Sequence, residues 1–256
     1  MKTPVIIAAR NEEKYIGRAL DSLDSERVEP LVIANGCEDD TAKIAEGFGA
    51  RVIELQEPGK LPAIQRGLRQ LGAQALAPVL FMDADSHPLF PRLWPASMTR
   101  HLSADKPAVV SGLVSFFDGR GLDNLARTAR RYQKSVEHRF HGDNDSLFGH
   151  NMAVRIGSQA VLEAVLDMDN IWPGEDRAMS DEITGSIGGY NQTLDPRSYM
   201  LTSARYHQPL RQRLKLGAQR SEQMALDHYA AIAVGTGAAI SYHNGSYVLA
   251  ADSRID

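Results

Sequence analysis

Short apolar runs separated by polar, helix-like segments make up the first third of the chain. Four of these runs, each followed by a turn signal, predict buried β-strands at residues 5–8, 31–34, 51–55 and 79–82. Helices are predicted between them at residues 12–23, 39–48 and 60–71. Strands that alternate with helices form mainly parallel, helix-covered sheets, so the pattern predicts an α/β fold. In such sheets, ligands bind at the carboxyl ends of the strands.

The second half of the chain is less regular. A strand is predicted over residues 108–115 and a basic helix over about 122–140. Two further helices are predicted over residues 158–166 and 176–187. No linker separates these segments from the first half, so we assign residues 1–206 to one main domain.

The C-terminal part, residues 207–256, reads as a helical, Ala/Gly-rich appendage. A polar helix is expected from about Pro209, and a stretch with small apolar residues and three glycines follows over residues 230–247. This composition suits close packing against a partner chain or a mobile lid near a ligand. We favour packing, which predicts a homo-oligomer.

Charge and cysteine content narrow the classes of protein. Lys and Arg number 28 and Asp and Glu 32, which gives a net charge of −4 over 256 residues and argues against a nucleic-acid partner. Cys37 is the only cysteine, so no internal disulfide can form, and a reducing cytosol is the expected compartment. The chain opens with a strand-like run, and its longest weakly polar stretch is interrupted by Gly235 and Gly237. We therefore expect a soluble, cytoplasmic protein without a secretion signal or a membrane span.

Two carboxylates, Asp83 and Asp85, directly follow the predicted buried strand 79–82. Carboxylates at this spacing can present oxygens to a hard divalent cation that also holds phosphate oxygens. The same D-x-D pattern occurs at residues 143–145 and 167–169, where solvated loop acids explain it. The first copy differs because it lies at the carboxyl end of a central strand. We therefore interpret Asp83 and Asp85 as functional.

Gly59 and Lys60 open the third predicted helix. A lysine at the positive end of a helix dipole is unfavourable unless an anion lies nearby, and a phosphate would supply that anion. A P-loop is excluded, because its pattern would need Gly at Glu54 and Ser or Thr at Leu61. The first strand also lacks the G-x-G-x-x-G of dinucleotide-binding proteins, which argues against hydride transfer. An ordinary surface lysine is an equal alternative for Lys60.

Seven short segments rich in polar residues occur in a characteristic order. They are VIIAARNEE (5–13), ANGCEDDT (34–41), GK (59–60), FMDAD (81–85), GHNMA (149–153), GED (174–176) and TSAR (202–205). In this order they resemble the family 2 glycosyltransferases of the GT-A fold, over roughly residues 4–207. The resemblance implies a Rossmann-like α/β sheet, a nucleotide-diphosphate sugar donor that is usually a uridine one, a divalent metal, and inverting transfer to a hydroxyl acceptor.

The resemblance also implies a role for each matching residue. Those that would bind the nucleotide sugar are Ala9, Arg10, Glu12, Asn35, Lys60, Asp83, Ala84 and Arg205. Asp83 would face the ribose, and Asp85, with Asp83 and His207 as further ligands, would hold Mg²⁺ or Mn²⁺, which prefer oxygen-rich sites. For Glu12, the helix dipole alone also favours an acid. The family often has two acids where this chain has Ala34 and Asn35, so we expect altered recognition of the nucleobase.

An inverting transfer needs a base that removes the proton of the acceptor hydroxyl. Asp176 matches the acid of the family's Glu-Asp motif, and Gly174 places it at the start of a predicted helix. A capping carboxylate would explain an Asp at this position without catalysis. The neighbouring acids that compete for the role are Glu175, Asp181 and Glu182.

Four further residues carry weaker expectations. The guanidinium of Arg205 could clamp the diphosphate with two parallel hydrogen bonds. His207 could reach the metal through its imidazole, although a solvated histidine is the simpler reading. His150 and Asn151 match the acceptor-side motif of the family, although a Gly-x-Asn turn is also ordinary turn chemistry.

A basic face is predicted on the helix over residues 122–140. Arg127, Arg130, Arg131 and Lys134 lie at spacings of three, four and seven, with His138 following. This face could meet a phosphorylated lipid acceptor or the anionic inner surface of a membrane, which would make the protein peripheral to that membrane. A solvated helix face is the favoured alternative.

Taken together, the sequence indicates an α/β enzyme of the hexosyltransferase kind. We expect it to move a sugar from a nucleotide-diphosphate donor to a saccharide, lipid-linked or small-molecule hydroxyl acceptor, with Mg²⁺ or Mn²⁺. One alternative is a sugar-phosphate nucleotidylyltransferase, which would need a Gly-rich loop where this chain has residues 8–11 (AARN). Another is a non-catalytic nucleotide-sugar-binding protein.

Overall fold

The computed structural model describes residues 2–102, 108–118, 129, 133, 151–169, 175–187, 189–203, 239–243 and 246–250. Side chains at residues 175–177, 186, 187, 190 and 192 and beyond residue 203 lie outside this description. The chain divides into two compact units, Met1–Ala204 and Arg205–Asp256, which are described separately.

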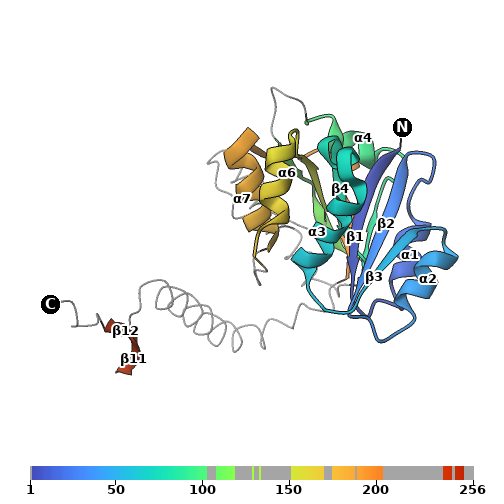
Figure 1. Cartoon of the computed structure of the whole chain (residues 1–256). Coiled ribbons are helices and arrows are strands. Elements are labelled where there is room, and N and C mark those ends of the chain that lie inside the picture. Colours follow the sequence, from blue (N-terminus) through green and yellow to red (C-terminus); the bar gives the residue numbers. More distant parts are fainter. Residues whose placement is uncertain are drawn as a thin grey trace. The chain divides into compact units, whose positions relative to one another are not determined.

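The first unit contains a seven-stranded sheet in the order β3-β2-β1-β4-β8-β6-β9 (Figure 1). Its strands are β1 (Thr3–Ala9), β2 (Val28–Asn35), β3 (Arg51–Leu55), β4 (Pro78–Asp83), β6 (Val109–Ser111), β8 (Asn151–Arg155) and β9 (Tyr190–Gln192). The first four are mutually parallel, and β8 runs antiparallel to both of its neighbours. The predicted α/β fold with a mainly parallel sheet is confirmed.

Helices cover both faces of this sheet (Figure 1). On one face lie α3 (Lys60–Leu71), α6 (Gln159–Leu166) and α7 (Glu175–Ile187), and on the other α1 (Ile16–Asp21), α2 (Thr41–Gly47) and α4 (Trp94–Thr99). Successive side chains of a strand point to opposite faces of the sheet, so each strand contributes to the hydrophobic core on both faces. Ile6 packs with the first group of helices, whereas Val5 and Ile7 pack with the second. All three side chains are at most 1% exposed, so β1 is buried on both faces.

The predicted helices agree with the observed ones to different degrees. The α3 helix begins and ends where its apolar spacing predicts, and α6 and α7 match within one residue. Ser158 caps α6, since its hydroxyl accepts a hydrogen bond from the backbone N–H of Val161. Our prediction of a helix from residue 12 was wrong at its start: α1 begins at Ile16, because residues 12–15 form a turn closed by the carbonyl of Glu12.

The predicted single strand over residues 108–115 was also wrong. The chain bends at Gly112 and Leu113, so β6 stays in the large sheet while β7 (Val114–Phe116) enters a second one. This second sheet has three strands in the order β5-β10-β7, with β5 at Ser86–Pro88 and β10 at Met200–Thr202. Two short 3₁₀ helices, η1 (Gly72–Leu76) and η3 (Pro196–Ser198), complete the described elements of this unit.

The described residues of the second unit form a β-hairpin. Its strands, β11 (Ala239–His243) and β12 (Ser246–Ala250), pair antiparallel. The polar helix predicted from Pro209 and the basic helix predicted over residues 122–140 lie outside the described residues, apart from positions 129 and 133. Within the described part of the chain, no helix has the length and apolar character that crossing a membrane requires.

The buried side chain of Asn151 connects the bend at Gly112 and Leu113 to the elements packed around it. Asn151, the first residue of β8, is 0% exposed, and its Nδ2 donates hydrogen bonds to the carbonyl oxygens of Leu113 (2.9 Å) and Ser198 (2.7 Å). Its Oδ1 accepts a hydrogen bond from the indole Nε1 of Trp94 at 2.9 Å. Every polar atom of the amide is therefore used within the protein, and the amide connects β8, α4, the bend and η3.

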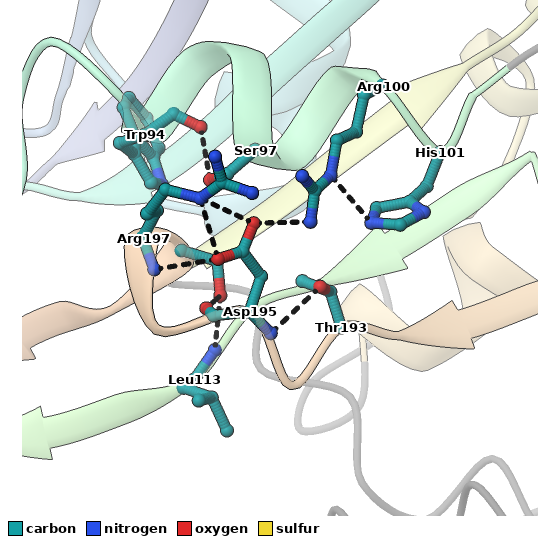
Figure 2. A network of polar contacts seen from close by, with 9 residues as sticks. Trp94, Ser97, Arg100, His101, Leu113, Thr193, Asp195 and Arg197 are labelled. Atoms are coloured by element: carbon teal, nitrogen blue, oxygen red, sulfur yellow. Dashed lines mark hydrogen bonds and ion pairs between the residues drawn. The ribbon is translucent and has the colours of Figure 1, made fainter.

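Beside this asparagine, an acidic residue holds η3 against α4 (Figure 2). Asp195 is paired with Arg100 and Arg197 on its two sides, and its backbone N–H donates to the hydroxyl of Thr193 at 3.2 Å. The hydrogen bond from the Arg197 side chain lowers the pKa of Asp195 from its ordinary 3.8, against burial, which raises it. The carboxylate therefore stays ionised at neutral pH and fixes the segment that leads into β10.

A substitution at Gly112 tests how tightly the bend is packed. A Cβ atom added there would lie 2.4 Å from Nδ2 of Asn151 and 2.8 Å from the carbonyl oxygen of Ser198. We expect Gly112→Ala to lower the free energy of unfolding by about 1–3 kcal/mol, because a buried amide and a backbone atom must move. Urea unfolding followed by circular dichroism measures the change.

Gly185 in α7 provides the matched control, because a Cβ added there meets no heavy atom within 4 Å. We expect Gly185→Ala to raise the free energy of unfolding by about 0.5–1 kcal/mol, since alanine restricts the unfolded chain more than glycine does. Equal stability of the two variants would contradict the tight packing at the bend.

Candidate functional site

The carboxyl ends of β1, β2 and β4 meet at one edge of the large sheet. In the register of the strands, Ala9 lies opposite Ala34, and Ala8 lies opposite Asp83. Three of the segments that the sequence singled out are therefore neighbours in space. Of the residues expected here, Ala9 and Ala84 are buried at 0% and 2% exposure, whereas the side chain of Arg10 is exposed.

Hydrogen bonds join the loops that follow β1 and β2. Asn11 adopts a positive φ of 54°, and its Oδ1 accepts a hydrogen bond from the backbone N–H of Glu38 at 2.9 Å. The backbone N–H of Glu12 donates to the hydroxyl of Thr41 at 2.7 Å, and the side chain of Glu12 is only 8% exposed. These bonds explain why residues 12–15 turn toward α2 before α1 begins, and they fix the backbone on which Arg10 stands.

Asp39 fastens the same two loops. Its carboxylate accepts hydrogen bonds from the backbone N–H groups of Glu13 and Thr41, each at 3.1 Å, and from the Thr41 hydroxyl. Burial would raise the pKa of Asp39, but these hydrogen bonds together hold it below the ordinary value of 3.8. The group is therefore a structural anion at neutral pH.

Asn35 connects the sheet edge to the start of α3. Its side-chain Nδ2 donates to the carbonyl oxygen of Ala9 at 2.8 Å, and its Oδ1 accepts from the backbone N–H of Gly59 at 3.0 Å. The side chain is 4% exposed. In this structure the Asn35 amide thus binds the protein's own backbone.

Lys60 reaches the first acid of the D-x-D segment. Its Nζ lies 3.1 Å from Oδ1 of Asp83, and the two side chains are 23% and 33% exposed. The anion that the sequence leads one to expect near this helix start is therefore present as a carboxylate. Because both side chains are still partly accessible, a bound ligand can contact them.

Asp85, the second acid, is more buried than Asp83 and contacts Thr202 at the end of β10. Asp85 is 8% exposed, and its carboxylate accepts a hydrogen bond from the hydroxyl of Thr202 at 3.2 Å. The end of β10 is thus brought to the end of β4 across more than a hundred residues of chain. Arg205 and His207, which follow Thr202, lie outside the described residues.

A third acid, Asp118, lies beside Thr202 and Ser203, and the sequence patterns did not indicate it. The hydroxyl of Ser203 donates to Oδ2 of Asp118 at 2.6 Å, and the backbone N–H of Phe117 donates to the carbonyl of Thr202 at 3.1 Å. Asp118 follows β7, whose separation from β6 the sequence pattern did not show. No local signal marks Asp118, because its importance comes only from its distant neighbours.

A cluster of ring and cationic side chains lies next to Asp118 and was also missed. The guanidinium of Arg18 stands 4.3 Å from the ring centre of Phe117, and its Nη2 lies 3.3 Å from Nε2 of His87. Burial, and then the charge of Arg18, lowers the pKa of His87 below 6.5, so the ring is neutral at pH 7. The cluster joins α1 to β5 and to the end of β7.

The two residues expected on the acceptor side are His150 and Asn151, and the structure describes only the second. The structure places the Asn151 side chain in the interior at 0% exposure, with its amide bound to Trp94, Leu113 and Ser198, so it has no exposed atom for an acceptor. Asn151 is the first residue of β8, and Gly149 lies outside the described residues, so the alternative of a Gly-x-Asn turn stays a prediction. His150 lies outside the described residues.

The candidate bases lie on α7. Asp176 is the second residue of this helix, in its first turn, and the side chains of Asp176 and Glu175 are outside the described ones. Asp181 is exposed and Glu182 half-buried.

A divalent cation fits the donor set at the end of β4. No group of three or more His, Cys, Asp or Glu side chains placed to share a metal occurs among the residues that the structure describes. Two carboxylates, Asp83 and Asp85, flank Ala84 at the strand end. Mg²⁺ and similar cations that also bind substrate phosphates commonly use only one or two protein carboxylates. The residues present therefore match a cation that arrives with phosphate oxygens.

The sequence profile described as glycosyl transferase family 2 matches residues 5–168. The chain therefore belongs to this family of glycosyltransferases. A 4,4'-diaponeurosporenoate glycosyltransferase of Staphylococcus aureus is 35% identical over 89 residues, which are 32% of this chain and 23% of that protein. The match thus spans about a quarter of the length of the relative.

Solved structures share the fold. TarS 1–349 of S. aureus aligns with a TM-score of 0.56 and 19% identity, over 80% of this chain and 61% of that one. Glucosyl-3-phosphoglycerate synthase of Mycobacterium tuberculosis, crystallised with Mn²⁺, UDP and glucosyl-3-phosphoglycerate, aligns with a TM-score of 0.53 and 20% identity, over 99% and 88%. The fold is that of the GT-A glycosyltransferases, as the sequence resemblance implied.

The role of Asp39 can be tested by its pH dependence. Its pKa is lowered in the folded protein, so its contribution to stability is present above pH 3.8 and is lost as the pH falls through the lowered value. We expect Asp39→Asn to lower the free energy of unfolding at pH 7 by about 1 kcal/mol, because a neutral amide accepts fewer hydrogen bonds.

The difference in stability between wild type and Asp39→Asn should shrink as the pH is lowered from about 5 toward 2. Urea unfolding across this range measures it, with Asp40→Asn as a control, since Asp40 at the N-cap of α2 makes no side-chain capping hydrogen bond. A difference that is independent of pH would refute the structural-anion role.

Proposed function

We propose that the protein transfers a sugar from a nucleotide-diphosphate donor to a hydroxyl acceptor, with a divalent cation. The observation that carries this proposal is the meeting of Lys60, Asp83, Asp85 and Thr202 beside the ends of β1 and β2. A cationic side chain and two carboxylates at one strand end match the opposite charges of a diphosphate and its cation. Membership of the family supports the reaction class.

The donor is proposed to lie along the edge formed by β1, β2 and the start of α3. Arg10 and Glu12 stand on the first loop, and Lys60 opens α3, whose N-terminus favours anions. We propose a uridine diphosphate sugar, in keeping with the UDP bound to the mycobacterial synthase that shares the fold. Arg205 remains our candidate for a second cationic contact with the phosphates.

Asp85 and Asp83 are the residues proposed to hold Mg²⁺ or Mn²⁺, with His207 as a further candidate. When bound, the cation neutralises the charge that develops on the departing nucleoside diphosphate. The hydroxyl of Thr202 orients the carboxylate of Asp85, because a carboxylate with one oxygen fixed presents the other in a defined direction. When the donor binds, Asp83 would give up its ion pair with Lys60 and face the ribose of the donor instead.

Asp176 is our candidate for the base in an inverting transfer. It would accept the proton of the acceptor hydroxyl as that oxygen attacks the sugar. Its place in the first turn of α7 also suits a helix-capping acid, and Glu175, Asp181 and Glu182 on the same helix are the alternatives. The acceptor itself is proposed to be a saccharide, a lipid-linked glycan or a small hydroxyl compound, and His150 a contact to it.

The cation site is tested by Asp85→Asn, which keeps the size of the side chain and an oxygen for Thr202 but removes the charge. We expect UDP binding in the presence of Mn²⁺ to weaken at least about 100-fold, because a ligand charge is lost. Isothermal titration with and without EDTA measures it. Asp169→Ala is the control, since this exposed acid belongs to the other described D-x-D copy. If UDP binding by Asp85→Asn depended on Mn²⁺ as it does in wild type, the cation site would have to be sought elsewhere.

The base is tested by Asp176→Asn, which keeps the shape and removes the charge. If Asp176 takes the acceptor proton, single-turnover transfer should fall by roughly two to four orders of magnitude while the Kd for UDP stays within a few fold. A capping residue behaves differently, because asparagine caps a helix about as well as aspartate. Full turnover in the variant would direct the search to Glu175, Asp181 or Glu182, and lost UDP binding would place Asp176 at the donor.

A further inference from the structure

We infer that Asn35 is a positioning residue of the donor site, which sets the start of α3 and thereby places Lys60 against Asp83. The family resemblance suggests a direct contact between this position and the nucleotide. The hydrogen bonds and burial of the side chain support a different role, in which Asn35 acts through Lys60. The inference rests on the proposed donor site.

The amide of Asn35 bridges three backbone segments. Its Nδ2 donates to the carbonyl oxygen of Ala9 at 2.8 Å, at the end of β1, and makes a longer contact of 3.4 Å with that of Ile33. Its Oδ1 accepts from the backbone N–H of Gly59 at 3.0 Å. With 4% exposure and with both ends of the amide engaged, the side chain is oriented by the protein itself.

The turn after Asn35 holds the same segment by direct contact. Gly36 has a φ of +60°, and a Cβ added there would lie only 3.0 Å from the backbone N of Pro58. Residues 58 and 59 therefore pack against the end of β2 at two adjacent points, one steric and one hydrogen-bonded. Such double fixation leaves the entry into α3 little freedom.

The beginning of α3 depends on this fixation. Gly59 precedes the helix and offers no side-chain cap, and its carbonyl accepts the backbone N–H of Ala63 at 3.1 Å. Lys60 is the next residue, and its Nζ lies 3.1 Å from Asp83. A shift of Gly59 is therefore passed directly to the lysine proposed to meet the donor.

An amide suits this position better than a carboxylate does. Two backbone carbonyl oxygens face Nδ2, and an ionised carboxylate at this position has no hydrogen to donate to them. A carboxylate would keep the acceptor for Gly59 but would place a charged oxygen against those carbonyls, without the protons they need. The chain thus has asparagine where the family often has an acid, for a reason that lies in its own backbone.

The experiment compares Asn35→Ala and Asn35→Asp with a matched control on α3, the helix that begins with Lys60. Gln65 is also a buried amide, 7% exposed, and its Nε2 donates to the carbonyl oxygens of Val165 (3.0 Å) and Met168 (2.9 Å), away from Lys60. Removing either amide should cost stability. Only the Asn35 variants should weaken binding of the probe, UDP with Mn²⁺, by about 10-fold or more, because the phosphate-binding group is misplaced.

Two readouts separate positioning from a general structural effect. Hydrogen exchange of the backbone amides of Gly59, Lys60 and Leu61 should speed up in both Asn35 variants and not in Gln65→Ala. In a Lys60→Ala background, Asn35→Ala should change the Kd for UDP by less than about 2-fold, because the effect passes through the missing lysine.

The outcomes distinguish this inference from the proposed function. Failure of wild-type protein to bind UDP, GDP or UDP-glucose with Mn²⁺ overturns the donor site, and the inference with it. When wild type binds, the inference is overturned if Asn35→Asp binds UDP as well as wild type does. It is also overturned if exchange at the amides of Gly59, Lys60 and Leu61 is unchanged, or if the effects of the Asn35 and Lys60 substitutions simply add.

Discussion

The parallel pairing of β1 with β2 on one side and β4 on the other is the constraint on which the rest of the structure depends. Because the centre of β1, Val5–Ile7, is buried on both faces, its side chains are apolar, and its hydrogen-bonding groups are taken up by the neighbouring strands. Polar groups can appear only where the strands stop. Parallel pairing then makes all three strands stop at one edge, which concentrates the charged chemistry of the molecule there.

The part of the domain beyond β4 follows a different principle, since most of its strands have only three residues. Strands of three residues bury little apolar surface, so β6, β7 and β10 need additional interactions to hold their places. The amide of Asn151 supplies them by binding the backbone at Leu113 and Ser198, and the carboxylate of Asp195 by binding the backbone N–H of Arg197 and the side chain of Arg100. This polar scaffold carries Thr202 to Asp85, so the interior asparagine supports the site without touching it.

The sequence patterns predicted those features of the fold that depend on residues near one another in the chain. The four parallel strands and the bounds of α3 follow from apolar runs and spacing, and the position of Asp83 and Asp85 after a buried strand marked the site. The break at Gly112 was not predictable, because it depends on contacts with Asn151 and Ser198, which are far away in the sequence. For the same reason Asp118 was missed, and the burial of Asn151 was not predicted, because its partners Trp94, Leu113 and Ser198 are far away in the sequence.

The ion pair between Lys60 and Asp83 has a consequence for how a charged ligand enters the site. Each group already has an opposite charge 3.1 Å away, so the field of the pair falls off as that of a dipole and not as that of a single charge. A diphosphate with its cation also carries both signs. If the proposed donor binds at this pair, its arrival is an exchange of partners at short range, in which shape guides the approach and long-range attraction contributes little.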